Sequence, residues 1–190
     1  ELNHRRAPGN TCMTSLDAIY RGKDPMNNSK GCGGVMRIAP IPLYAAVQDR
    51  MSIEEADLLA GEAAEITHQH PLGYISAALM SHVIYRLARD IEPTQGSMKR
   101  YIIEGVDMIR KQYQTYHNDV ERMAELAERA IYLLDNGKTD LENIGHLGEG
   151  WTGEEALAIA LYCALKHFDN FEDAMIAAVN HGGDSDSTGA

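Results

Sequence analysis

The chain has 190 residues, of which 17 are Lys or Arg and 28 are Asp or Glu, so its formal net charge is −11. This length suits one domain with a substantial core, and a composition of 44% hydrophobic and 24% charged residues excludes disorder of the whole chain. The acidic balance argues against a nucleic-acid or membrane-surface partner, because either would favour a basic face. The longest apolar run, Ala156 to Leu165, is too short to span a bilayer.

Three cysteines are widely spaced and form no C-x-x-C pair, which is typical of reduced thiols rather than a disulfide framework. Residues 1–6 lead into no apolar stretch, so they do not resemble a secretory signal. We therefore expect a cytoplasmic protein and, by default, a monomer. The chain opens without Met and stops just after a promising motif, which indicates a piece of a longer protein. The cysteines are Cys12, Cys32 and Cys163.

Helical periodicity extends over nearly the whole chain, and no stretch alternates as a strand would, which predicts a single all-α domain over residues 1–190. A first helix is expected from about residue 10 to Gly22, followed by a polar, glycine-rich loop over residues 26–34. A short helical run interrupted by Pro40 and Pro42 follows and resumes to about residue 48. The apolar residues expected to bury the first helix are Leu16, Ile19 and Tyr20.

The middle of the chain carries clear helix boundaries. Ser52 to Glu55 form a capping box that opens one helix. Pro71 breaks this helix and suits the first turn of the next, where its missing N–H costs little. The two apolar faces are Ala56, Leu59, Ala60, Ala63 and Ala64 in the first helix, and Leu72, Ile75, Leu79, Val83 and Leu87 in the second.

Two further helices are expected at residues 97–112 and 119–136, followed by a loop over residues 141–150. Thr152 to Glu155 resemble a second capping box, and the helix after it is apolar on nearly all sides, which is typical of the centre of a bundle. Asn170 is expected to cap a last helix that ends at Gly182 and Gly183.

Three polar loops are candidates for function. In the last of them, Asp184 and Asp186 with interleaved hydroxyls are hard oxygen ligands of the kind that Mg²⁺, Mn²⁺ or Ca²⁺ prefers. The alternative is a helix C-cap followed by an N-cap.

The glycine-rich loop over residues 27–34 has exposed amides that could cradle a phosphate, although it matches no standard nucleotide motif. An ordinary surface loop, or a nucleophile at Cys32, remains open as an alternative. His68 and His70 could bind a metal or a substrate or act as acid and base, or they could simply be favoured by a helix dipole.

Five ordered blocks, distributed over essentially the whole chain, resemble the ADP-ribosylglycohydrolase family, which includes the dinitrogenase-reductase-activating glycohydrolases and the ADP-ribosyl-acceptor hydrolases. The resemblance implies a compact multi-helix orthogonal bundle. It also implies hydrolysis of the bond between ADP-ribose and a protein side chain or small acceptor. The blocks are Gly9 to Cys12, Asn28 to Pro40, Thr67-His68 with Pro71, Gly148 to Trp151 with Glu154 to Leu157, and Asn180 to Ala190.

The resemblance further implies a centre of two divalent cations, Mg²⁺ or Mn²⁺, with Asp184 and Asp186 as catalytic residues and with Asp184, Asp186 and Ser187 as metal ligands. The glycine-rich loop matches the segment that wraps ADP-ribose, His68 a nucleotide contact and Trp151 an apolar wall. Arg37 and Glu155 we expect to be structural, because a buried ion pair would explain both. The candidate substrate-binding residues are Asn27, Asn28, Ser29, Lys30, Gly31, Cys32, Gly33, His68 and Trp151.

The chain departs from the family pattern in several places. It lacks an upstream Gly-Asp-x-x-Gly…Glu motif, a Thr-Asp-Asp triplet and a C-terminal helix, so half of the expected metal ligands are absent. Cys32 stands where many members carry Asn. If these residues are the whole molecule, we expect weak metal binding and little hydrolysis. The alternatives are a non-catalytic ADP-ribose-binding or structural, crystallin-like relative, and an unrelated helical domain with coincidental caps.

Overall fold

The computed structural model describes residues 9–48 and 51–190, and the expectation about a signal sequence at residues 1–6 lies outside them. Within these residues the regular elements are ten α-helices and three short 3₁₀ helices, which confirms the all-α prediction. The α-helices are α1 (Asn10–Tyr20), α2 (Pro40–Gln48), α3 (Ile53–Glu65), α4 (Pro71–Arg89), α5 (Gln95–Gln112), α6 (His117–Tyr132), α7 (Asp140–Gly145), α8 (Gly153–Lys166), α9 (Phe171–Val179) and α10 (Ser185–Thr188). The 3₁₀ helices are η1 (Val35–Arg37), η2 (Gln114–Tyr116) and η3 (Leu133–Asp135).

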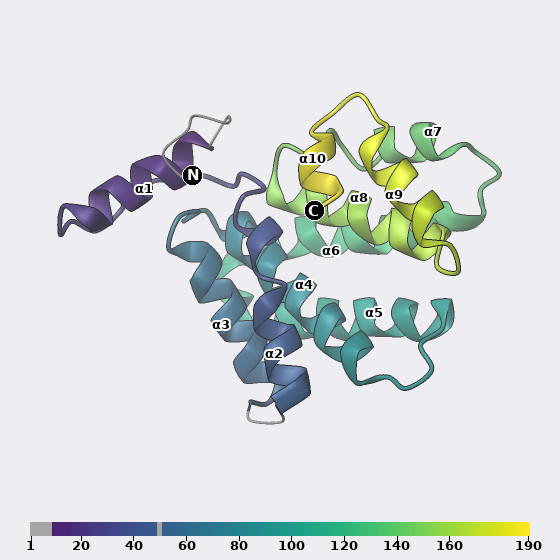
Figure 1. Ribbon diagram of the computed structural model, residues 1–190, viewed down its shortest axis with the longest axis horizontal. Helices are drawn as coiled ribbons and strands as arrows, with labels where there is room; N and C mark the ends of the chain where they lie inside the picture. The colour runs from purple at the N-terminus through teal and green to yellow at the C-terminus, as the bar shows by residue number, and fades with distance from the viewer. Residues whose placement is uncertain (1–8, 49–50) are drawn as a thin grey trace.

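Helices α4 and α8 form the centre of an orthogonal bundle. Figure 1 shows α2 and α3 crossing the direction of α5, α6 and α8, as the family resemblance implies. Ile75 and Leu79 of α4 and Ile159 and Leu165 of α8 are fully buried. The prediction that the helix after residue 152 is central is therefore confirmed, because a helix that is apolar on all sides needs neighbours on all sides.

Small residues bring α3 close to α4, as its sequence pattern predicts. Ala56, Ala60 and Ala64 are completely buried, whereas Leu59 of the expected face is 39% exposed. The face is narrower than the periodicity suggests, because the alanine row alone makes the close helix contact.

Local cap signals place several helix ends correctly. Ser52 forms the predicted capping box with Glu55 at the start of α3. Pro71 occupies the first turn of α4 behind His70, which is the N-cap residue and accepts from the Leu72 amide through Nδ1 at 3.1 Å. The helix-dipole alternative placed His70 at the C-terminal end of the preceding helix, and the structure instead uses it to begin the next helix.

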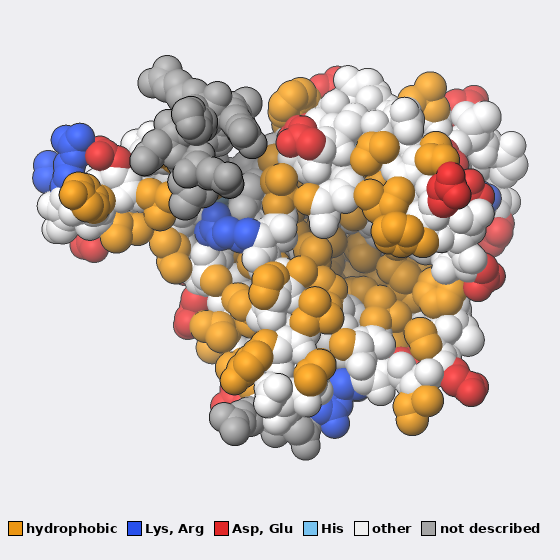
Figure 2. All heavy atoms as spheres, in the orientation of Figure 1, with side chains coloured by type: hydrophobic (Ala, Val, Ile, Leu, Met, Phe, Trp, Pro, Cys, Tyr) orange, Lys and Arg blue, Asp and Glu red, His pale blue; other side chains and the backbone are white. Residues whose placement is uncertain are grey.

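The first helix differs from the prediction, because its apolar residues are not in the core. Leu16, Ile19 and Tyr20 are 52%, 44% and 90% exposed, and Ser15 is the buried residue of α1. Figure 1 shows α1 extending away from the other helices, and Figure 2 shows hydrophobic side chains on the surface over α1 and α2. Periodicity identifies which residues share a face, but it does not show whether another element covers that face.

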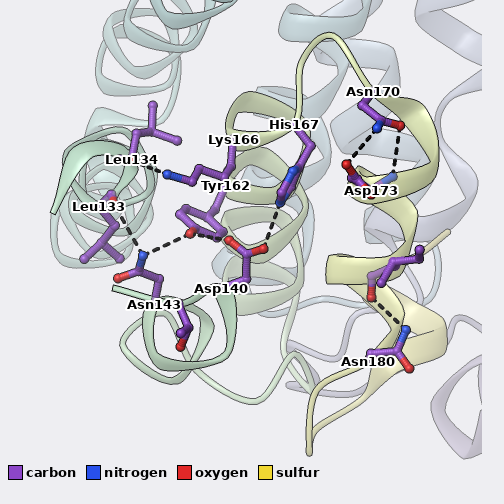
Figure 3. Close-up of polar contacts among 12 residues, drawn as sticks. Leu133, Leu134, Asp140, Asn143, Tyr162, Lys166, His167, Asn170, Asp173 and Asn180 are labelled. Carbon is purple, nitrogen blue, oxygen red and sulfur yellow. Dashed lines mark hydrogen bonds and ion pairs between the residues drawn. The ribbon is translucent and has the colours of Figure 1, made fainter. Parts of the chain in front are cut away.

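The predicted loop over residues 141–150 is wrong in its first half, which forms α7. A capping box between Thr139 and Glu142 starts this short helix. Figure 3 shows how α7 is attached to α8: the Asp140 carboxylate accepts from the Tyr162 hydroxyl and pairs with His167 Nε2, both at 2.8 Å. A helix of one and a half turns has too little periodicity to be recognised in sequence.

The last long helix begins as predicted and ends earlier. The Asn170 side chain accepts from the Asp173 amide at 3.2 Å and caps α9, which stops at Val179 instead of at the glycine pair. No helix within the described ranges is both long and apolar enough to cross a bilayer. All three cysteines are free thiols, as their spacing predicts.

Candidate active site

Three segments that are distant in sequence meet on one side of the bundle. They are the α1–η1 loop (residues 27–34), the glycine turn before α8 (residues 148–152) and the C-terminal turn (residues 181–188). The Cys32 amide donates to the Trp151 carbonyl at 3.3 Å, and the Asp184 amide donates to the Glu149 carbonyl at 2.7 Å. The glycine turn therefore joins the other two segments through the backbone, and Figure 1 shows α10 beside the segment that leads into α8.

Asn27 holds the beginning of the α1–η1 loop in place. Its Nδ2 donates to Thr67 O at 3.1 Å and to Ser15 Oγ at 3.3 Å. Its Oδ1 accepts from the amides of Ser29 at 3.0 Å and Gln69 at 3.2 Å. The side chain was predicted to bind substrate, and in the structure its donor and acceptor atoms are used within the protein.

The next residues of the loop present free polar groups. Asn28 is exposed, and its side chain makes no polar contact in the described part of the chain. The amides of Lys30 and Gly33 have no acceptor among residues 9–48 and 51–190, whereas the Gly31 amide donates to Ser29 Oγ at 3.3 Å. Unpaired amides in a tight glycine-rich loop are suited to binding an anion.

The loop packs on a buried histidine, which leaves little room for a side chain at Gly33. A Cβ at Gly33 would lie 3.1 Å from His68 Cε1, and one at Gly31 would lie 3.4 Å from His68 Nε2. His68 is 3% exposed, and its Nδ1 lies 2.8 Å from Thr67 Oγ1. Burial lowers the pKa of His68 and the Arg37 guanidinium lowers it further, so the ring is neutral at pH 7. His68 therefore lies behind the loop as a support, and its role as a nucleotide contact stays a prediction.

The C-terminal turn brings a carboxylate to the other side of the loop. Ser187 Oγ donates to Asp184 Oδ2 at 2.7 Å, and both residues are 8% exposed. Cys32 Sγ donates to the same oxygen at 3.2 Å and lies 3.1 Å from Ser187 Oγ. The structure thus brings Asp184, Ser187 and Cys32 together, but Asp186 is exposed and does not join them.

The environment of Cys32 disfavours the nucleophile hypothesis. Burial raises the pKa of the Cys32 thiol to about 11, and the neighbouring Asp184 carboxylate also raises it. The thiolate is the reactive form of cysteine. At neutral pH Cys32 is therefore a protonated donor to Asp184.

Backbone conformations available mainly to glycine shape the glycine turn. Gly148 has φ 132° and Gly150 has φ 85°. Glu155 Oε2 accepts from the amides of Glu149 and Gly150, both at 3.2 Å, which fixes the turn on the start of α8. Trp151 follows with 59% of its surface exposed, so its ring is accessible to a ligand, and its role as an apolar wall stays a prediction.

Arg37 and Glu155 both make structural contacts, as expected, but within the described residues they form no ion pair with each other. Arg37 donates to the carbonyls of Ala63 at 2.7 Å and Gly33 at 3.2 Å, and it thereby ties α3 to the loop. The second predicted capping box is also wrong, because Glu155 binds the glycine turn and Thr152 makes no side-chain cap.

The described residues supply only part of a metal site. Asp184 and Ser187 are oxygen donors of the kind that Mg²⁺ and Mn²⁺ prefer, and they are already adjacent. Within residues 9–48 and 51–190, however, no three His, Cys, Asp or Glu side chains gather closely enough to hold an ion. The donor set therefore fits a hard divalent cation in kind and is incomplete in number.

Sequence reasoning missed Glu154, which is 1% exposed and pairs with Lys30 of the loop at 2.7 Å. The available signal was a second carboxylate in the first turn of an otherwise apolar helix. Thr11 was also missed as a support: its hydroxyl donates to Ser29 Oγ at 3.2 Å, so α1 contacts the loop through polar residues.

Comparison with known proteins shows the family of this chain. A family model described as ADP-ribosylglycohydrolase matches residues 1–190. Proteins named ADP-ribosylhydrolase ARH3 are similar: that of Homo sapiens is 24% identical over 193 residues, covering 90% of this chain and 49% of the relative. Those of Mus musculus and Bos taurus are 23% and 25% identical over 90% of this chain and 48% of each relative. The chain spans about half the length of these relatives, and it belongs to the ADP-ribosylglycohydrolase family.

Proposed function

We propose that this chain contributes to a metal-dependent hydrolase that cleaves the glycosidic bond between ADP-ribose and a protein side chain or small acceptor. One observation carries the proposal: Cys32 of the α1–η1 loop lies 3.2 Å from Asp184 of the C-terminal turn, across 152 residues of sequence. A loop suited to a diphosphate is thereby placed beside a buried carboxylate suited to a cation. Family membership and the similarity to ARH3 proteins support the same chemistry.

The protein's own groups have to bind the diphosphate, because a net charge of −11 repels it at long range. The amides of Lys30 and Gly33 would donate to phosphate oxygens at short range, where local dipoles outweigh the global field. The exposed Asn28 side chain is available to a neighbouring ribose or phosphate. Because Asn27 and His68 hold the loop from behind, its amides are ordered before the ligand arrives, and less entropy is lost on binding.

Asp184, Ser187 and the exposed Asp186 are the residues that would hold the cations. When bound, Mg²⁺ or Mn²⁺ would polarise the distal ribose and lower the pKa of a water. Ser187 and Cys32 both donate to Asp184 Oδ2, so they orient this carboxylate.

The test is calorimetric titration of ADP-ribose into the 190-residue chain, with and without Mn²⁺ or Mg²⁺, and with the Asp184→Asn variant in parallel. We expect weak metal-dependent binding in the parent chain and none of that dependence in D184N, because the donor set is incomplete and the variant also loses its buried carboxylate. Glu172→Gln, at an exposed carboxylate in the first turn of α9, is the matched charge control and should bind as the parent does.

Two further results decide between hydrolase and binding protein. Release of ADP-ribose from an arginine-linked, serine-linked or small-molecule conjugate, reduced by orders of magnitude in D184N, would support the enzyme. Binding without release from any conjugate by a protein of the relatives' full length would instead establish the non-catalytic alternative. Failure of ADP-ribose to bind under any metal condition would contradict the proposed function of this chain.

A further inference from the structure

Glu154 is a buried carboxylate with only half of its acceptor capacity used. Its side chain is 1% exposed, and Oε1 accepts from Lys30 Nζ at 2.7 Å. Its other oxygen, Oε2, is buried without a hydrogen-bond partner among the described residues. Because an ionised carboxylate is costly to bury, a position that keeps one at the start of an apolar helix needs a specific explanation.

Backbone hydrogen bonds join the same two segments that the Lys30–Glu154 ion pair connects. The Gly153 amide donates to the Lys30 carbonyl at 2.8 Å, and Gly31 forms an antiparallel bridge with Thr152. Lys30 is therefore held at two points by one short segment, through its carbonyl and through its ammonium group. The ion pair adds to the backbone bridge on the residue that lies directly before the glycines of the loop.

Because the loop contains glycines, its backbone conformation depends on contacts with residues outside the loop. Gly31 and Gly33 have no side chains with which to resist rotation of the backbone. The beginning of the loop is fixed by Asn27, and its end enters η1. Lys30 lies between these supports, and its contacts with Glu154 and Gly153 help to hold the middle of the loop, together with the bond from the Cys32 amide to the Trp151 carbonyl.

We propose that Glu154 is a positioning residue for anion binding: it orders residues 30–33 through the Lys30 ammonium and does not itself contact the ligand. The proposal rests on the proposed function for its ligand, the diphosphate of ADP-ribose. The ordering of the loop can be measured without any ligand.

Two hypotheses about Glu154, a purely electrostatic effect on the ligand and a positioning effect through Lys30, predict opposite changes in ADP-ribose affinity for Glu154→Gln. If Glu154 acts only as a negative charge near a diphosphate, removing it strengthens binding. If it acts through Lys30, removing it releases the loop and weakens binding. We expect the dissociation constant of ADP-ribose to rise about tenfold, because the variant replaces the charge-assisted hydrogen bond from Lys30 with a weaker bond to a neutral amide oxygen.

The first measurement is amide hydrogen exchange of the 190-residue chain without ligand, for the parent, E154Q and E172Q. We expect the Gly31 and Cys32 amides to exchange about tenfold faster in E154Q, while the core of α4 and α8 keeps its protection. E172Q removes an exposed carboxylate from the same position of another helix and should match the parent. Unchanged exchange at residues 30–33 in E154Q, or equal acceleration throughout the molecule, would overturn the proposal.

A double-mutant cycle then separates this proposal from the proposed function. Lys30→Met, E154Q and the double variant are compared by ADP-ribose titration, and the double variant should be no worse than K30M, because both changes act on one contact. Additive losses, or tighter binding in E154Q, would refute positioning. If ADP-ribose does not bind the parent chain, the proposed function fails, and the exchange experiment alone decides the role of Glu154.

Discussion

Asn27 and Asn28 are adjacent in the α1–η1 loop, and both are predicted to bind substrate. Within the described residues, only the Asn27 side chain has hydrogen-bond partners. Asn27→Ala would delete four hydrogen bonds, two donated by Nδ2 and two accepted by Oδ1. At roughly 0.5–1.5 kcal/mol net for each bond, with water replacing part of the loss at this half-buried site, the free energy of unfolding should fall by about 2–3 kcal/mol. Asn28→Ala should change it by less than about 0.5 kcal/mol, because the side chain is exposed and unpaired in the described residues.

The assay is urea denaturation followed by circular dichroism, with hydrogen exchange of residues 27–34 as a local readout. N27A should lower the midpoint and release the Ser29 and Gln69 amides, whose acceptor it removes. N28A should leave both measurements unchanged and instead weaken ADP-ribose binding. Equal stability and equal loop exchange in the two variants would refute the assignment of Asn27 as the internal support of the loop.

Two further predictions follow from backbone geometry and from a buried thiol. Gly150→Ala should destabilise the protein by about 1–3 kcal/mol, because φ is 85° and the new Cβ would lie 2.8 Å from Thr188 Cγ2. Gly145→Ala, which meets nothing within 4 Å, is the control, and similar melting temperatures for the two would contradict the strain. The raised pKa of Cys32, about 11, means that the folded state disfavours the thiolate, so stability present below pH 9 is lost as the pH rises through about 11. Cys32→Ser should flatten that part of the pH–stability curve, and an unchanged curve would show that the thiol does not contribute.

Much of the fold could be predicted because its signals are local. Ser52 and Asn170 cap α3 and α9 with partners three residues away, so the sequence window contains the whole interaction. The apolar pattern after residue 152 likewise predicts a central helix, since every face of α8 carries residues that water disfavours.

Predictions of side-chain contacts failed where more than one contact was compatible with the sequence pattern. Glu155 has the spacing of a capping box with Thr152, yet its carboxylate binds the amides of the glycine turn. Leu16 and Ile19 have the spacing of a buried face, yet α1 contacts the α1–η1 loop through the polar side of the helix, at Thr11. In both cases the competing partner lies in a turn or loop whose path the residue pattern does not specify.

In the candidate site, too, some features follow from the local sequence and others from the tertiary structure. By itself, the sequence determined which residue types are present: the glycines of residues 31–34, the carboxylates of the C-terminal turn, and the ordered blocks that indicate the family. Only the tertiary structure decided that Cys32 and Ser187 both contact Asp184, that Asp186 remains exposed, and that Glu154 holds Lys30 across 124 residues. Caps and periodicity depend on neighbours within a few residues, whereas these contacts depend on how α4 and α8 pack, and so they exist only after the core has formed.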